Sequence, residues 1–136
     1  MNPGMRINYE GHLRNRAVHL RSGNELITDA PTDNHGKGEA FSPTDLLCTS
    51  LASCMITLMG ITAEGKGILL GNITADIEKV MYGEPRRVGE IHIHLTIEDK
   101  GYSEKERTIL ENAAKTCPVA KSIHPDIKQV VDFRYA

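Results

Sequence analysis

The sequence predicts an α+β fold, with two main helices packed on one face of a mostly antiparallel sheet. Three patterns support this prediction. Apolar and polar residues alternate strictly over 90–98, which is typical of a strand with one buried face. A long apolar segment over 42–60 begins with helix-capping residues, and Ser103-Glu-Lys-Glu106 is a capping box that opens a second helix. The length fits a single domain over 1–136.

The first thirty residues predict an antiparallel meander, because short runs of β-forming residues are separated by turns. Its strands are expected over 6–12, 16–21 and 25–28. The next segment, 30–38, is rich in Pro, Gly, Asn and Asp and therefore predicts a loop.

The first helix is expected to begin at Ser42, which can cap it, and to end at Gly65. Pro43 suits its first turn, and Asp45 places an acid near the positive end of the helix dipole. Apolar residues cover most of the circumference of this helix, so we expect it to be covered on nearly all sides. In so small a chain, that pattern indicates a partner subunit.

The rest of the chain predicts a hairpin around a turn at 84–89, the second helix and a last strand over 127–135. Pro118 disfavours the helical conformation at Cys117. Cys117 is therefore expected either to end the second helix or to cap a short helix after it.

Composition excludes several classes of function. With 16 Lys and Arg against 18 Asp and Glu, nothing draws the chain to nucleic acid or to an acidic membrane surface. Thr, Ser and Gly interrupt the longest apolar run, and the N-terminus lacks the pattern of a signal peptide, so we expect a cytoplasmic protein that does not span a membrane. Three cysteines without metal-ligand spacing predict neither a disulfide scaffold nor a metal site.

Cys54 and Cys117 are the candidate reactive groups. If the fold brings them together, one thiol can attack a substrate and the other can resolve the product as a disulfide. The alternative is that both are buried packing residues, as free cysteines often are. Cys48 lies about 9 Å along the helix axis from Cys54, beyond disulfide reach, and is expected in the core.

A reactive Cys54 needs a nearby cation, because the helix dipole acts only within the first turn and Cys54 lies about three turns from the helix start. Arg14, Arg16 and Arg21 in the first hairpin are the candidates that precede the helix. His35 lies in the Gly-rich loop ahead of the helix, and functional residues gather on such loops. His124 is either a base near the second thiol or a surface histidine.

The segment Phe41-Ser-Pro-Thr-Asp-Leu-Leu-Cys-Thr-Ser-Leu-Ala-Ser-Cys54, followed by Cys117-Pro-Val-Ala, resembles the OsmC/Ohr family, and the order of elements agrees over nearly the whole chain. The resemblance implies an intertwined homodimer whose central helices are enclosed by sheets of both subunits. It also implies a thiol peroxidase of oxidative-stress defence that acts on organic hydroperoxides. Cys54 would be the peroxidatic thiol and Cys117 the resolving thiol. No bound cofactor is implied, and the reductant would be a dithiol, such as a dihydrolipoyl group on a protein.

The match departs from the family at the activating residues. Well-studied peroxidases of the family hold an Arg with a Glu at the position of Thr44, so Asp45 or Glu39 would have to replace that Glu. Arg14 or Arg16 is the nearest match to the Arg, and His35, Glu39 and Asp45 are the candidate substrate-site residues. The pattern is most similar to the YhfA-like branch. The second hypothesis is a non-catalytic OsmC-like dimer that binds a small apolar or electrophilic ligand at its interface.

Overall fold

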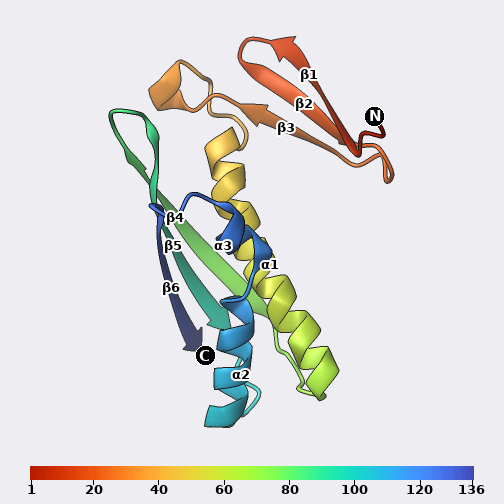
Figure 1. Ribbon diagram of the computed structural model, residues 1–136, viewed down its shortest axis with the longest axis vertical. Coiled ribbons are helices and arrows are strands. Elements are labelled where there is room, and N and C mark those ends of the chain that lie inside the picture. Colours follow the sequence, from red (N-terminus) through yellow and green to blue (C-terminus); the bar gives the residue numbers. More distant parts are fainter. The chain divides into compact units, whose positions relative to one another are not determined.

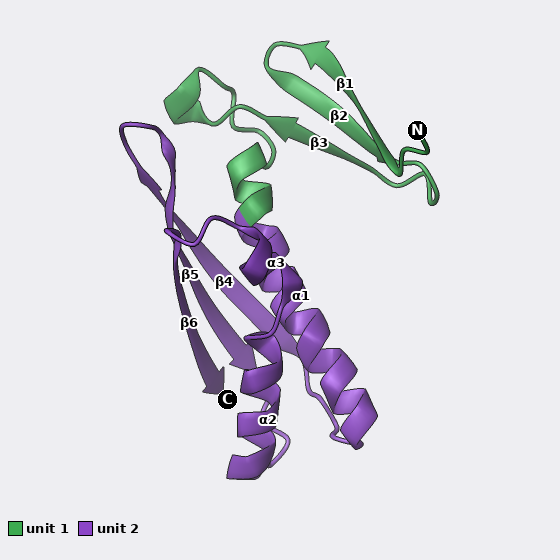
Figure 2. Cartoon of the chain, viewed as in Figure 1, with its two compact units in different colours: residues 1–47 green, residues 48–136 purple.

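The computed structural model describes residues 1–136. The chain forms two compact units, Met1–Leu47 and Cys48–Ala136 (Figure 2). Each unit contains one three-stranded sheet. The predicted α+β class is confirmed, but the strands are shared between two sheets instead of one (Figure 1). The boundary between the units falls within helix α1 (Pro43–Lys66).

The first unit is the predicted meander. Strands β1 (Met5–Gly11), β2 (Arg14–His19) and β3 (Glu25–Asp29) pair antiparallel in that order. A short 3-10 helix, η1 (Thr32–Asn34), lies in the predicted loop. At the turn between β1 and β2, His12 and Leu13 have φ angles of 53° and 62°. These left-handed angles match the twist of the paired strands, although non-glycine residues adopt them at some cost.

One face of this small sheet is apolar and exposed. Ile7, Ala17 and Leu26 are direct cross-strand neighbours and therefore share that face. No apolar side chain of the first unit is buried, because the buried residues there are Thr28, Asp29 and Ser42. The large exposed side chains on this face are Met5, Ile7, Tyr9 and Leu26.

The second unit holds the hydrophobic core. Strands β4 (Ile73–Tyr82) and β5 (Arg87–Ile97) form the predicted hairpin, and β6 (Lys128–Tyr135) pairs with β5. Helices α1 and α2 (Glu104–Ala114) lie on one side of this sheet (Figure 1). The strict alternation along β5 is confirmed, because four of its side chains are fully buried: Ile91, Ile93, Leu95 and Ile97.

The pairing of β5 with β6 is parallel, which differs from a purely antiparallel sheet. The connection between these strands contains α2 and the short helix α3 (Pro118–Ser122). A parallel pair requires such a long crossover, because the chain must return to the end of the sheet from which it started.

The caps of the helices follow the sequence closely. Ser42 Oγ accepts from the Asp45 backbone N–H at 3.0 Å, and Asp45 Oδ2 accepts from the Ser42 N–H at 2.9 Å. Ser103 and Glu106 form the equivalent box on α2. Cys117 is the N-cap of α3, which is the second of its two expected positions. By length and composition α1 would also qualify as a membrane span, a test that core helices pass as well.

Candidate functional site

The two candidate thiols meet within the second unit. Cys54 lies on α1 and is half-buried, whereas Cys117 is fully buried at the start of α3. Both are free thiols, and they lie close enough for Cys54 to contribute to the raised pKa of the Cys117 thiol. The fold therefore brings together two cysteines that are 63 positions apart (117 minus 54) in the chain.

The surroundings of Cys117 favour its protonated form. Its Sγ accepts from the Ala120 backbone N–H at 3.3 Å and lies 4.0 Å from the Leu51 carbonyl oxygen of α1. Burial raises the pKa of the Cys117 thiol above its ordinary value, and the neighbouring Cys54 raises it further, against the opposing hydrogen bond from Ala120. Cys117 is thus a neutral thiol at pH 7, and the more exposed Cys54 is the thiol that a dissolved substrate can reach.

Cys48 occupies a different place. It is 2% exposed and belongs to the buried side of α1 together with Leu51 and Met55. Its predicted position in the core is confirmed.

Arg14 is held by Asp29, an acid outside the set of predicted site residues. Its Nε and Nη2 each donate to a carboxylate oxygen of Asp29 at 2.7 Å, so the guanidinium and the carboxylate pair side by side. Arg14 and Asp29 are direct cross-strand partners in β2 and β3. Asp29 is 2% exposed, and its hydrogen bonds with Arg14 hold the pKa of its carboxyl below the ordinary value.

The structure gives the positions and contacts of the other predicted residues of the first unit. Arg16 pairs with Glu10 and Glu25 on the surface. The carboxylate of Asp45 caps α1. Glu39 and His35 are exposed, and His35 ends η1 with a left-handed φ of 68°.

The histidines form local polar pairs. His92 pairs with Glu90 at 2.8 Å and His94 with Asp132 at 2.7 Å. His124 is an exposed residue of the loop before β6. No three His, Cys, Asp or Glu side chains of residues 1–136 gather as a metal site would require.

Asp29 could have been found from the register of the hairpin. If β2 and β3 are paired around the turn at 20–24, with Val18 opposite Glu25, then Arg14 falls opposite Asp29. The sequence therefore contains the pairing of Arg14 with Asp29, but finding it requires the register of two strands, and composition does not fix where those strands end.

The comparisons with known proteins identify the family. A family model described as OsmC-like protein matches residues 36–131. The chain belongs to the OsmC-like family. A crystal structure from Psychrobacter arcticus, named for an assigned role in osmotic stress and detoxification, is 54% identical and has a TM-score of 0.93. The match covers 98% of this chain and 97% of that chain. No curated protein sequence matches the chain.

More distant OsmC-like structures share the fold. An organic hydroperoxide resistance protein OsmC from Legionella pneumophila is 18% identical, with a TM-score of 0.71 and coverage of 96% of each chain. An organic hydroperoxide resistance protein from Elizabethkingia anophelis is 14% identical, with a TM-score of 0.75 and coverage of 100% of this chain and 99% of that chain. At these identities the likeness shows the fold.

Proposed function

We propose that this OsmC-like protein is a thiol peroxidase that reduces organic hydroperoxides. The observation that supports it best is the proximity of a half-exposed thiol, Cys54, to a buried neutral thiol, Cys117. This arrangement suits a two-step reaction in which the accessible thiol reacts first and the buried thiol reacts second.

Each step of the proposed reaction is balanced. The Cys54 thiolate attacks the O–O bond of the hydroperoxide and forms a sulfenic acid, while the departing alkoxide takes up a proton and leaves as an alcohol. The Cys117 thiol then condenses with the sulfenic acid, forming an S–S bond and releasing water. A dithiol such as a dihydrolipoyl group reduces the disulfide and is itself oxidised. The protein needs no bound cofactor for this cycle.

The proposed source of the activating charge is Arg14. A thiolate at neutral pH requires a nearby cation, and a guanidinium stays charged at every relevant pH. Asp29 fixes the orientation of Arg14 through two hydrogen bonds, so it would take the place of the Glu that is replaced by Thr44. In this proposal Arg14 acts on the sulfur, and Asp29 is a positioning residue.

We further propose a homodimer located in the cytoplasm and acting in oxidative-stress defence. A three-stranded sheet becomes stable when its apolar face is covered, and Met5, Ile7 and Tyr9 on β1 are each 60% or more exposed. On α1, Ile61 is also 61% exposed. Obligate dimers bury more than about 2,000 Å² between subunits, so a folded monomer is not expected at micromolar concentration. Sedimentation of a folded monomer at that concentration would contradict this part of the proposal.

The activity is tested by the consumption of cumene hydroperoxide with dihydrolipoamide as reductant, compared with hydrogen peroxide. Turnover should be faster with cumene hydroperoxide and absent in Cys54→Ser. Cys48→Ser is the matched control, because Cys48 lies on the same helix but in the core. Equal turnover in all three proteins would refute the proposal.

The departure from the family pattern at Thr44 favours a second candidate, a non-catalytic dimer that binds a small apolar or electrophilic ligand at its interface. In that case neither peroxide is consumed. Cys54 alkylation would then rise only near pH 8.5 and above, as for an ordinary thiol.

A further inference from the structure

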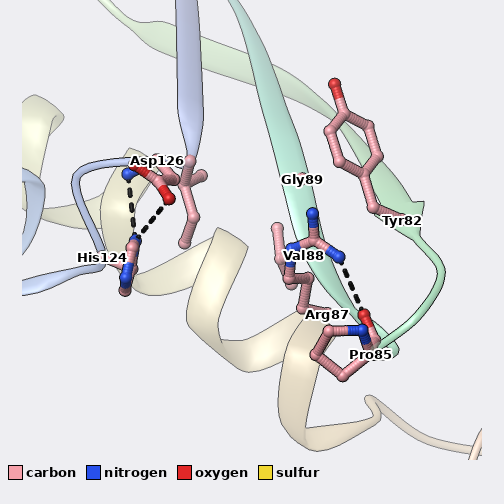
Figure 3. A pocket seen from close by; sticks show the side chains of 8 residues that line it. Tyr82, Pro85, Arg87, Val88, Gly89, His124 and Asp126 are labelled. Carbon is pink, nitrogen blue, oxygen red and sulfur yellow. Dashed lines mark hydrogen bonds and ion pairs between the residues drawn. The ribbon is translucent and has the colours of Figure 1, made fainter.

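A cavity of about 360 Å³ opens at the β4–β5 turn within the second unit, and neither Cys54 nor Cys117 lines it. Two walls define it (Figure 3). The hairpin contributes Tyr82, Pro85 and Arg87–Gly89, and the connection between α3 and β6 contributes His124, Asp126 and Ile127. The volume lies within the range of pockets that hold small organic molecules.

The floor of the cavity is apolar and closely packed. Val88 is 6% exposed, and Gly89 is also buried. A Cβ atom on Gly89 would lie 2.2 Å from the ring of Tyr82, so only glycine allows this ring to lie against β5. The Tyr82 hydroxyl donates to Glu90 at 2.7 Å, which fixes the ring in place.

Arg87 presents a charged edge in these apolar surroundings. Its Nη1 donates to the carbonyl oxygens of Gly83 and Pro85, both at 2.9 Å. Its guanidinium carbon lies 5.5 Å from the centre of the Tyr82 ring, within the range of a cation–π contact. Both of these hydrogen bonds use Nη1, so the edge formed by Nε and Nη2 takes no part in them. The side chain is therefore oriented by the turn, while one donor edge stays available.

That edge suits a planar carboxylate. Arg14 uses the same two atoms, Nε and Nη2, to hold the carboxylate of Asp29. A single free guanidinium edge can balance one negative charge. A doubly charged phosphate would need more donors than this one edge supplies. Asp126 on the opposite wall is 88% exposed and lies 3.8 Å from the His124 ring nitrogen, so water and the imidazole screen its charge.

We propose that this cavity binds a small apolar monocarboxylate, with its carboxylate on Arg87 and its hydrocarbon part against Val88, Ile127 and the Tyr82 ring. This site goes beyond the proposed peroxidase function, because it uses neither Cys54 nor Cys117.

The test is a titration of the full-length protein with hexanoate, followed by two-dimensional amide NMR spectra. A Kd on the order of 1 mM is expected for a ligand of this size. The amide signals of Val88, Gly89 and Ile127 should shift and saturate. Hexanamide, the neutral analogue, should bind about tenfold more weakly or worse in the same wild-type protein, because it cannot form the charge-assisted pair. Acetate should also bind weakly, because it lacks the hydrocarbon part.

Variants locate the charge and the site. Arg87→Gln should weaken hexanoate binding about tenfold, whereas Arg86→Gln, an exposed neighbour that does not line the cavity, should leave the Kd unchanged. Cys54→Ser should bind hexanoate as the wild type does, whether or not the protein is a peroxidase. Equal affinities for hexanoate and hexanamide, no saturable shifts at these amides, or loss of binding in Cys54→Ser would each overturn the proposal.

Discussion

Replacing Cys117 by Ser separates the chemical role of this residue from its structural role. Serine is a favoured N-cap residue, so its Oγ can still accept from the Ala120 N–H that now bonds to Sγ at 3.3 Å. Its own O–H would be buried, and the Leu51 carbonyl, to which the thiol now donates, lies 4.0 Å from the longer Cys side chain's sulfur. An unsatisfied buried hydroxyl costs about 1–3 kcal/mol, and the better cap offsets part of that cost.

The net destabilisation of Cys117→Ser is therefore expected at about 1–2 kcal/mol. For 136 residues the entropy of unfolding is about 0.29 kcal/mol/K, which converts this loss to a fall of about 3–7 °C in Tm. The folded variant should consume one equivalent of cumene hydroperoxide per chain and then stop, leaving a sulfenic acid on Cys54 that dimedone traps. Stopped-flow peroxide consumption and mass spectrometry measure both results. Continued turnover at the wild-type rate would refute the role of Cys117.

Two further predictions concern the pair of Arg14 and Asp29. Arg14→Ala should slow the alkylation of Cys54 by iodoacetamide at pH 7 tenfold or more. Asp29→Asn should slow it by a smaller factor, because this change loosens the guanidinium without removing it. Unchanged alkylation rates would show that neither residue acts on the thiol. Because the folded-state pKa of Asp29 lies below its ordinary value of 3.8, the stabilisation from this pair is present above that pH and is lost as the pH falls through the lower folded-state pKa. Chemical denaturation should therefore give the wild type a larger free energy of unfolding than Asp29→Asn at pH 7, and this difference should shrink below pH 3.8. A difference in unfolding free energy that stays constant with pH would contradict the ion pair.

Local patterns predicted the elements well. The alternation along β5 correctly placed Ile91 and Ile93 in the core, because one face of a strand packs against helices. The capping box at Ser103 and the helix-breaking effect of Pro118 located the start of α2 and the cap at Cys117. Each of these signals depends on residues within a few positions of one another.

Long-range pairing was harder to predict. The alternation of a strand does not show whether its neighbour runs parallel or antiparallel, so the parallel pairing of β6 with β5 did not follow from the sequence. The contact between Arg14 and Asp29 likewise depends on the register of β2 against β3. Asp45 was a reasonable candidate for holding the Arg, but its carboxylate completes the cap of α1.

The central claim is that Cys54 and Cys117 form the catalytic disulfide, and peptide mapping after oxidation tests it most directly. Wild-type protein is treated with one equivalent of cumene hydroperoxide per chain, its remaining thiols are alkylated, and the digest is analysed without reduction. We expect a linked peptide pair containing Cys54 and Cys117, an intact mass lower by about 2 Da before alkylation, and a single alkylated thiol, Cys48. Alkylation of all three cysteines after peroxide treatment, or a disulfide that includes Cys48, would contradict the account.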